Sequence, residues 1–267
     1  MIQIREPAVA GYFYPAGSGD LAAAIRAMLP DSRKPPLPAP KALIVPHAGY
    51  IYSGPVAASA YVCLQPWGER YRRVVLLGPA HTACFEGLAA SAADRFRTPL
   101  GEIEVDQAAI AALDDRVVIR SDRAHDAEHS LEVQLPFLQS LLSGFRIVPL
   151  LTGRVEASMV AQVIEALWGG PETLFVVSSD LSHYLPYEQA CERDRATCQA
   201  IEHGDPEAVG DTDACGSVAV AGLLIAARRH GLETRTIDLR NSGDTAGSRD
   251  AVVGYGSWLF REQDAKP

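Results

Sequence analysis

The sequence of 267 residues lacks the apolar segments of a membrane protein and the excess of basic residues typical of a nucleic-acid-binding protein. No stretch approaches the roughly 20 apolar residues of a membrane-spanning helix, and the first residues lack the apolar run of a secretory signal peptide. Acidic residues outnumber basic ones, 33 against 24, for a formal net charge of −9. We therefore expect a cytoplasmic protein that binds neither nucleic acid nor a membrane through non-specific electrostatic attraction.

Cysteines are few and show no spacing typical of a metal site or a redox pair. None of the five forms a Cys-x-x-Cys pair; they are Cys63, Cys84, Cys191, Cys198 and Cys215. An odd number without paired spacing indicates free, mostly buried thiols in a reducing compartment. Cys84 lies three residues after His81, but free cysteines are usually core residues, so we interpret it as core.

Two glycine signatures are also missing. The chain has no Gly-x-Gly-x-x-Gly fingerprint and no Gly-x-Ser-x-Gly motif, so the sequence supports neither a nucleotide cofactor nor a serine hydrolase.

The composition is that of a folded protein, with 48% hydrophobic and 21% charged residues. This balance is enough to bury a sizeable core and excludes a disordered chain.

Short apolar runs alternate with helical patterns along most of the chain. The runs predict strands near 42–45, 74–77, 145–151, 174–177, 234–239 and 252–259. Helices are predicted near 21–29, 53–64, 128–142, 155–168, 187–203 and 217–229. This alternation is typical of a largely parallel sheet covered on both faces. We predict a single three-layer α/β/α domain over residues 1–267, with an extended proline-rich connection at 32–40.

Several residues predict how the helices begin. Ser53 is expected to cap the helix at 53–64, and Asp106 to cap a short helix that follows it. In the helix predicted at 128–142, leucines recur at helical spacing, and Pro136 should kink or offset it.

Three histidines closely follow predicted strands. His47 comes directly after Pro46, His81 follows Gly78-Pro79-Ala80, and His183 closes the run that begins at Ser178. Ligands of open α/β sheets bind just beyond the carboxyl ends of the strands, so we expect a shared crevice. Imidazole suits zinc, copper or iron, and we predict His47 and His81 as metal ligands. The alternative is that each histidine only bonds a loop carbonyl.

Other polar residues near these strand ends have two possible roles. His183 is predicted as a third ligand or a general base. Asp180 would orient a histidine or bind the metal, or with Ser182 it would only cap the next helix. His129, beside Glu128, is predicted to orient substrate or to hold a metal ligand in place.

A turn near the C-terminus offers a carboxylate. If Asn241-Ser242-Gly243-Asp244 reaches the crevice, Asp244 would complete a set of two histidines and one carboxylate. That set, with open positions, is the arrangement of non-haem iron oxygenases. Tyr50, Tyr52 and Tyr184 stand beside the histidines and either line the pocket or pack in the core.

Six motifs in order carry a resemblance to a known family. They are REPAVAGYFYP (5–15), PHAGYIYSGP (46–55), LGPAHT (77–82), EHSLEVQLPFL (128–138), SDLSHY (179–184) and NSGD (241–244). Together they resemble the Memo family, whose prokaryotic members are called AmmeMemoRadiSam system protein B. The resemblance covers essentially the whole chain.

This resemblance implies a fold similar to the LigB-type class III extradiol dioxygenases, which are non-haem iron enzymes. His47 and His81 match the two metal-site histidines of the family. His183 falls where the dioxygenases have their catalytic histidine, and His129 belongs to the same pocket. The third ligand departs from the pattern, because dioxygenases have a glutamate there and animal Memo proteins have a cysteine near the position of Asp244. The name of the system implies an AMMECR1-type protein and a radical SAM enzyme as partners.

Three hypotheses for function follow. In the first, a redox enzyme uses iron or copper at His47 and His81 on a small catechol-like molecule, with His183 as base and Asp244 as third ligand or support. In the second, zinc activates a water for hydrolysis, assisted by His183 or Asp180. In the third, the inherited pocket binds a peptide or a partner protein without chemistry.

Overall fold

Four parallel strands with buried side chains form the centre of the sheet. The computed structural model describes residues 2–30 and 38–262, so most of the connection predicted at 32–40 lies outside the described residues. The strands are Ala42–Val45 (β2), Arg73–Pro79 (β3), Arg146–Thr152 (β8) and Thr173–Ser178 (β9). They pair in the order β8-β3-β9-β2. Parallel strands covered on both faces appear as continuous apolar runs, which is why the sequence predicts all four.

Mixed pairing extends this centre in both directions. Beyond β8 lie Gly101–Val105 (β6), Arg95–Thr98 (β5) and Ile4–Arg5 (β1). Leu88–Ala90 (β4) also pairs with β8, and Val118–Arg120 (β7) pairs with β4. Beyond β2 lie Val252–Glu262 (β12), with Leu232–Asn241 (β11) and His183–Leu185 (β10) paired to it. The described residues thus form a twelve-stranded sheet, and the prediction of a single α/β domain with a mostly parallel sheet is confirmed.

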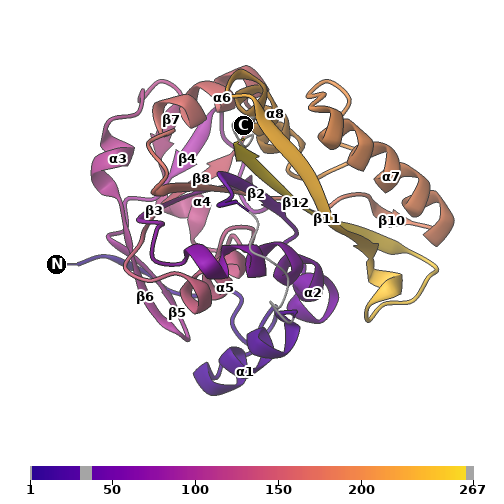
Figure 1. The fold of residues 1–267 in the computed structure, drawn as a ribbon. Coiled ribbons are helices and arrows are strands. Elements are labelled where there is room, and N and C mark those ends of the chain that lie inside the picture. Colours follow the sequence, from indigo (N-terminus) through magenta and orange to yellow (C-terminus); the bar gives the residue numbers. More distant parts are fainter. Residues whose placement is uncertain (1, 31–37, 263–267) are drawn as a thin grey trace.

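Helices cover the two faces of the sheet (Figure 1). Ser18–Met28 (α1), Tyr50–Tyr61 (α2) and Leu135–Leu141 (α5) pack together on one face. Ala157–Ala166 (α6) and Ser217–Arg229 (α8) pack on the other, while Tyr187–His203 (α7) packs on β11 and β12. The short helices are Val62–Trp67 (η1), Gln107–Ala111 (α3), Asp122–His125 (α4), Glu132–Gln134 (η2) and Ser242–Asp244 (η3). Among the described residues, no helix has the length and apolar character to span a membrane.

Two helix starts differ from the prediction, and one agrees with it. α2 begins at Tyr50 with Gly49 as its N-cap, so Ser53 lies inside the helix and its hydroxyl donates to the Ala48 carbonyl at 2.8 Å. The helix predicted at 128–142 is reduced to η2 and α5. Proline is tolerated in the first turn of a helix but not in its interior, and Pro136 accordingly stands in the first turn of α5. Asp106 caps α3, as expected.

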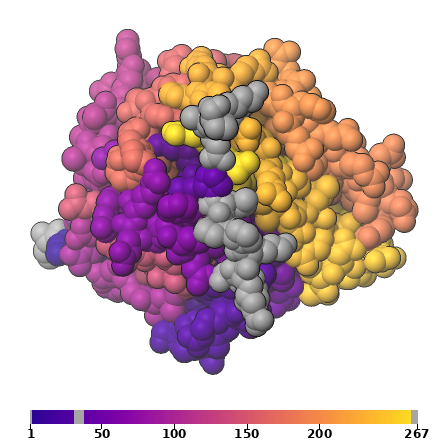
Figure 2. Space-filling view, in the orientation of Figure 1, coloured from indigo at the N-terminus to yellow at the C-terminus, as the bar shows by residue number. Residues whose placement is uncertain are grey.

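The chain connections of two neighbouring parallel strands diverge at the carboxyl edge of the sheet. β2 leads into α2 on one face, whereas β9 leads on to α7 and then to α8 on the other. Such a divergence between neighbouring parallel strands is where open α/β sheets bind ligands. In the space-filling view, the orange and yellow C-terminal segments occupy one side of the molecule and the indigo to magenta segments the other (Figure 2).

Candidate metal centre at the carboxyl edge of the sheet

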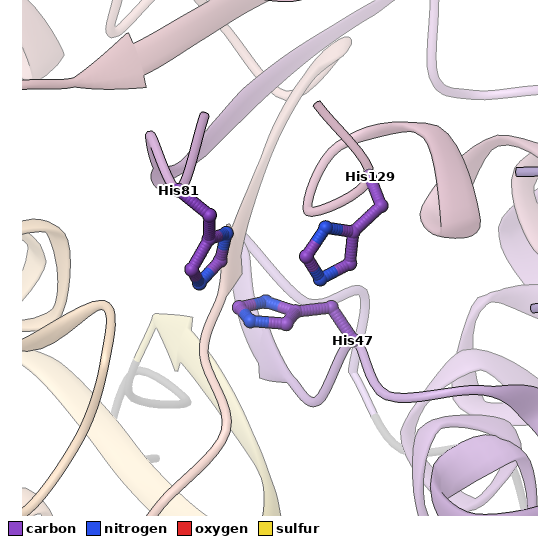
Figure 3. A group of neighbouring side chains, drawn as sticks. All are labelled: His47, His81 and His129. Carbon is purple, nitrogen blue, oxygen red and sulfur yellow. The ribbon is translucent and has the colours of Figure 1, made fainter. Parts of the chain in front are cut away.

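Three histidines come together at this edge. His47 follows β2, His81 follows β3, and His129 lies just before η2. Their rings point toward one another (Figure 3), with one ring nitrogen from each residue within 4.8 Å of the others. The structure therefore brings His47 and His81 together, although β9 lies between their strands, and it adds His129 to them.

The carboxylate of Glu128 holds two of these residues in place. It accepts hydrogen bonds from His81 Nδ1 at 2.9 Å, from the His81 backbone N–H at 2.5 Å, and from the backbone N–H groups of His129 and Ser130 at 2.9 Å each. Burial alone would raise the pKa of Glu128, but these hydrogen bonds outweigh burial and lower it to about 2. A carboxylate can only accept, so Nδ1 of His81 carries a hydrogen, and Nε2 is the ring nitrogen left to bind a metal.

His47 is the most buried of the three, at 2% exposure. Its Nδ1 lies 2.8 Å from Ser178 Oγ, its Nε2 lies 3.2 Å from Cys215 Sγ, and its backbone N–H donates to Asp180 Oδ1 at 2.7 Å. Burial, helped by the neighbouring histidines, lowers the pKa of His47 well below its usual value. The ring is therefore neutral at physiological pH, which is the form that binds a metal.

His129 packs in the wall of the site. Its ring centroid lies 4.7 Å from that of His81 and 4.6 Å from that of Phe13 in the N-terminal arm. Burial lowers its pKa, against the opposing charge of Glu128, whose Oε1 lies 3.3 Å from His129 Nδ1. This ring is also available as a neutral ligand.

A cavity of about 550 Å³ opens in front of the histidines and is lined by two further predicted site residues, Asp180 and His183. Asp180 is 4% exposed, and burial raises the pKa of its carboxyl despite the hydrogen bond from the His47 backbone. His183 is exposed at the start of β10. Both side chains therefore share one cavity with the three histidines.

Aromatic side chains form much of the remaining wall. Phe13, Tyr52, Tyr184 and Tyr255 line the cavity, and Tyr184 is 76% exposed. Tyr184 also has a positive φ of 58° within a register shift of β10 against β12. Tyr50 instead belongs to the core, where its hydroxyl donates to the Val133 carbonyl.

Asp244 is engaged elsewhere. Its Oδ2 accepts from the backbone N–H of Asn241 at 3.2 Å, which closes a capping box in η3, and its Oδ1 accepts from the Tyr187 hydroxyl at 2.7 Å. Ser242 of the same turn does line the cavity. The Asp244 carboxylate is not part of the group formed by the three histidines among the described residues, and its role as ligand stays a prediction.

Cys215 is the residue of this site that sequence reasoning missed. Besides contacting His47, it lines a second cavity of about 670 Å³. Cys84 lines the same cavity and is exposed, so the interpretation of Cys84 as a core residue was wrong. Burial raises the pKa of the Cys215 thiol to about 12. Because 168 residues separate it from His47, no local spacing could reveal the contact.

A mostly parallel α/β sheet with a cluster of histidines beyond its carboxyl edge defines the class: a candidate α/β metalloprotein. The model of the Memo-like protein family matches residues 5–259, and the chain belongs to this family. It is 41% identical to a MEMO1 family protein of Aeropyrum pernix over 95% of this chain and 98% of that relative. MEMO1 family proteins of Sulfolobus acidocaldarius and Aquifex aeolicus are 36% and 35% identical, over 96% and 97% of this chain and 99% and 100% of theirs. The resemblance seen in the sequence motifs is confirmed.

Proposed function

We propose that this chain binds a redox-active metal, iron or copper, and uses it in dioxygenase-like oxidation of a small molecule. The observation that carries the proposal is the convergence of ring nitrogens from His47, His81 and His129 within 4.8 Å. These residues fit such a metal, because imidazoles bind iron, copper and zinc, and a neighbouring thiol adds a softer donor. When bound, the metal would supply Lewis acidity and electron transfer at the cavity.

The residues that would hold the metal differ in whether their side chains are already placed to bind it. The three histidines already face one another, and Cys215 Sγ is 3.2 Å from His47 Nε2. Asp244 would first have to release its bonds with Tyr187 and Asn241. Neither residue belongs to the group of three histidines among the described residues, but Cys215 already contacts one of them, so we place it ahead of Asp244 as the additional ligand.

Two residues are proposed to handle protons. His183 lines the cavity with an exposed side chain, which suits a base that takes a proton from a substrate hydroxyl. Asp180 is buried beside His47, and its raised pKa favours a carboxyl group that exchanges a proton with a molecule bound in the cavity.

The family resemblance supports an AMMECR1-type protein and a radical SAM enzyme as proposed partners, besides a small-molecule or peptide ligand.

Metal content tests the site. We expect protein purified anaerobically to contain close to one metal ion per chain, and the double variant His47→Ala/His81→Ala to lose it, because both ligands that flank β9 are gone. Elemental analysis measures this directly. His203→Ala is the matched control, since His203 is exposed in the last turn of α7 and should leave the metal in place. Unchanged metal content in the double variant would rule out the site.

Zinc-dependent hydrolysis is the second candidate. Three histidines with an open position for water are a ligand set used by catalytic zinc. Oxygen consumption with a panel of aromatic diols separates the two candidates, because a hydrolase consumes none. A pocket that stays free of metal after anaerobic iron loading would instead favour a binding role without chemistry.

A further inference from the structure

A set of hydrogen bonds meets Nδ1 of His47 among buried residues that do not line the cavity. Ser178, the last residue of β9, is central to it. Its Oγ donates to the Ser130 carbonyl at 2.7 Å, accepts from Gln134 Nε2 at 2.9 Å, and lies 2.8 Å from His47 Nδ1. Ser178 and Gln134 are both fully buried, so water does not compete for these bonds.

The orientation of the Gln134 side chain is set by its neighbours. Its Nε2 donates to the Pro46 carbonyl at 3.0 Å as well as to Ser178, and its Oε1 accepts from the Tyr61 hydroxyl at 2.9 Å. A carbonyl can only accept, so the amide nitrogen must face Pro46. Gln134 therefore presents an N–H, and not an oxygen, to Ser178.

This assignment decides what Ser178 can offer to His47. A serine hydroxyl has one hydrogen and two lone pairs. The hydrogen goes to the Ser130 carbonyl and one lone pair accepts from Gln134, which leaves the other lone pair for the ring. His47 Nδ1 must then be the donor, and its Nε2 carries no hydrogen. The position of Cys215 Sγ, 3.2 Å from Nε2, suits a thiol hydrogen facing a bare ring nitrogen.

We propose that Gln134 and Ser178 are positioning residues that hold His47 in the tautomer with hydrogen on Nδ1, so that Nε2 is ready to bind a metal. His81 is held in the same tautomer by the charged Glu128, whereas His47 is held by uncharged groups only. A neutral hydroxyl avoids placing a second carboxylate in the fully buried position behind His47, where burial disfavours charge. The metal-binding consequence rests on the proposed function; the tautomer does not.

The tautomer can be measured in metal-free protein. With ¹⁵N-labelled histidine, long-range proton–nitrogen NMR should show a protonated Nδ1 and a bare Nε2 for His47 in the wild type. Ser178→Ala should leave His47 as a mixture of tautomers. Ser257→Ala is the matched control, because that buried serine hydroxyl has no hydrogen-bond partner among the described residues. A wild-type His47 with hydrogen on Nε2, or a Ser178→Ala variant that keeps a pure Nδ1–H form, would overturn the proposal.

Metal affinity is the second readout. Competition titrations with Zn²⁺ and a chromophoric chelator should show affinity reduced about 10- to 100-fold in Ser178→Ala and unchanged in Ser257→Ala. If Ser178→Ala and the wild type bind Zn²⁺ with equal affinity, the tautomer of His47 does not prepare Nε2 for metal binding, and that part of the proposal is wrong. If Ser178→Ala does not fold, Ser178→Cys, whose thiol is only a weak hydrogen-bond partner, takes its place with the same expectations. A wild type with the Nδ1–H tautomer but no metal binding would overturn the proposed function and leave the tautomer assignment standing.

Discussion

At the scale of single residues, the candidate site combines three histidines with strained and exposed wall residues. Burial keeps His47 and His129 neutral, and Glu128 stays ionised because its hydrogen bonds outweigh its burial. Tyr184 is different: it has a positive φ and an exposed ring, so its backbone is strained without a gain in core packing. Strain of this kind persists at functional sites, and it agrees with the position of Tyr184 at the cavity.

The strain at Tyr184 predicts an unusual effect of glycine. Glycine accepts a φ of 58° without cost, whereas a side chain costs about 1 kcal/mol there. We expect Tyr184→Gly to leave the free energy of unfolding unchanged or up to about 1 kcal/mol higher, despite the loss of a whole aromatic ring. Urea denaturation measures it. Tyr52→Gly, within α2, should lower stability by about 1 kcal/mol, and a similar loss in Tyr184→Gly would contradict the argument.

At the scale of elements, the N-terminal arm is joined to the segment that carries His129. Glu132 of η2, fully buried, accepts hydrogen bonds from the backbone of Ala8 and Val9 at 2.8 and 3.0 Å, and pairs with Arg5 of β1. The arm in turn places Phe13 on the His129 ring. Residues more than 110 positions apart therefore build one wall of the site, as the Tyr14 hydroxyl on Glu132 also shows.

Breaking this anchor should cost much more than breaking a surface pair. Glu132→Gln leaves the Arg5 guanidinium buried without a countercharge, and removal of one partner of a buried pair typically costs about 3 to 5 kcal/mol. We expect a loss near the lower end in urea denaturation, because the substituted amide keeps one acceptor oxygen. Glu6→Gln, which removes the exposed partner of Arg97, should change stability little. Equally small losses in both variants would show that the arm is not held by this pair.

At the scale of the whole molecule, buried neutral histidines couple folding to pH. His125 lies outside the group of three histidines, is 2% exposed, and its Nε2 contacts the Ala89 carbonyl at 3.0 Å. Burial lowers its pKa to about 4. Below pH 6.5, the ordinary pKa of histidine, His125 is protonated in the unfolded chain, whereas in the folded chain it stays neutral down to about pH 4. Stability must therefore fall as the pH drops from 6.5 to 4.

Replacing His125 should weaken this pH dependence. His125→Gln keeps an N–H for Ala89 but does not titrate, so the stability of the metal-free variant should fall about 2 kcal/mol less than that of the wild type between pH 7 and pH 5. Thermal or urea denaturation at several pH values measures the difference. His203→Gln, at an exposed position, should follow the wild type. Parallel curves for His125→Gln and wild type would contradict the assignment.

The sequence by itself determined the central strands, the helices α7 and α8, and the positions of His47 and His81 at strand ends. These features depend on local patterns: a buried parallel strand needs an unbroken apolar run, and its end is marked by proline or glycine. The start of α5 could not be predicted from the leucine spacing, which indicated a longer helix. In the structure the helix begins at Leu135, with Pro136 in its first turn.

Only the tertiary structure decided which polar groups meet. Glu128 reaches His81 across 47 positions, Cys215 reaches His47 across 168, and Asp244 turns instead to its own capping box. Contacts of this kind depend on the order of strands in the sheet, which places β9 between β2 and β3, and no periodicity along the chain records that order. The position of His47 and His81 beyond strand ends is therefore readable from local sequence patterns, whereas the groups that hydrogen-bond to each histidine are decided by the assembled fold.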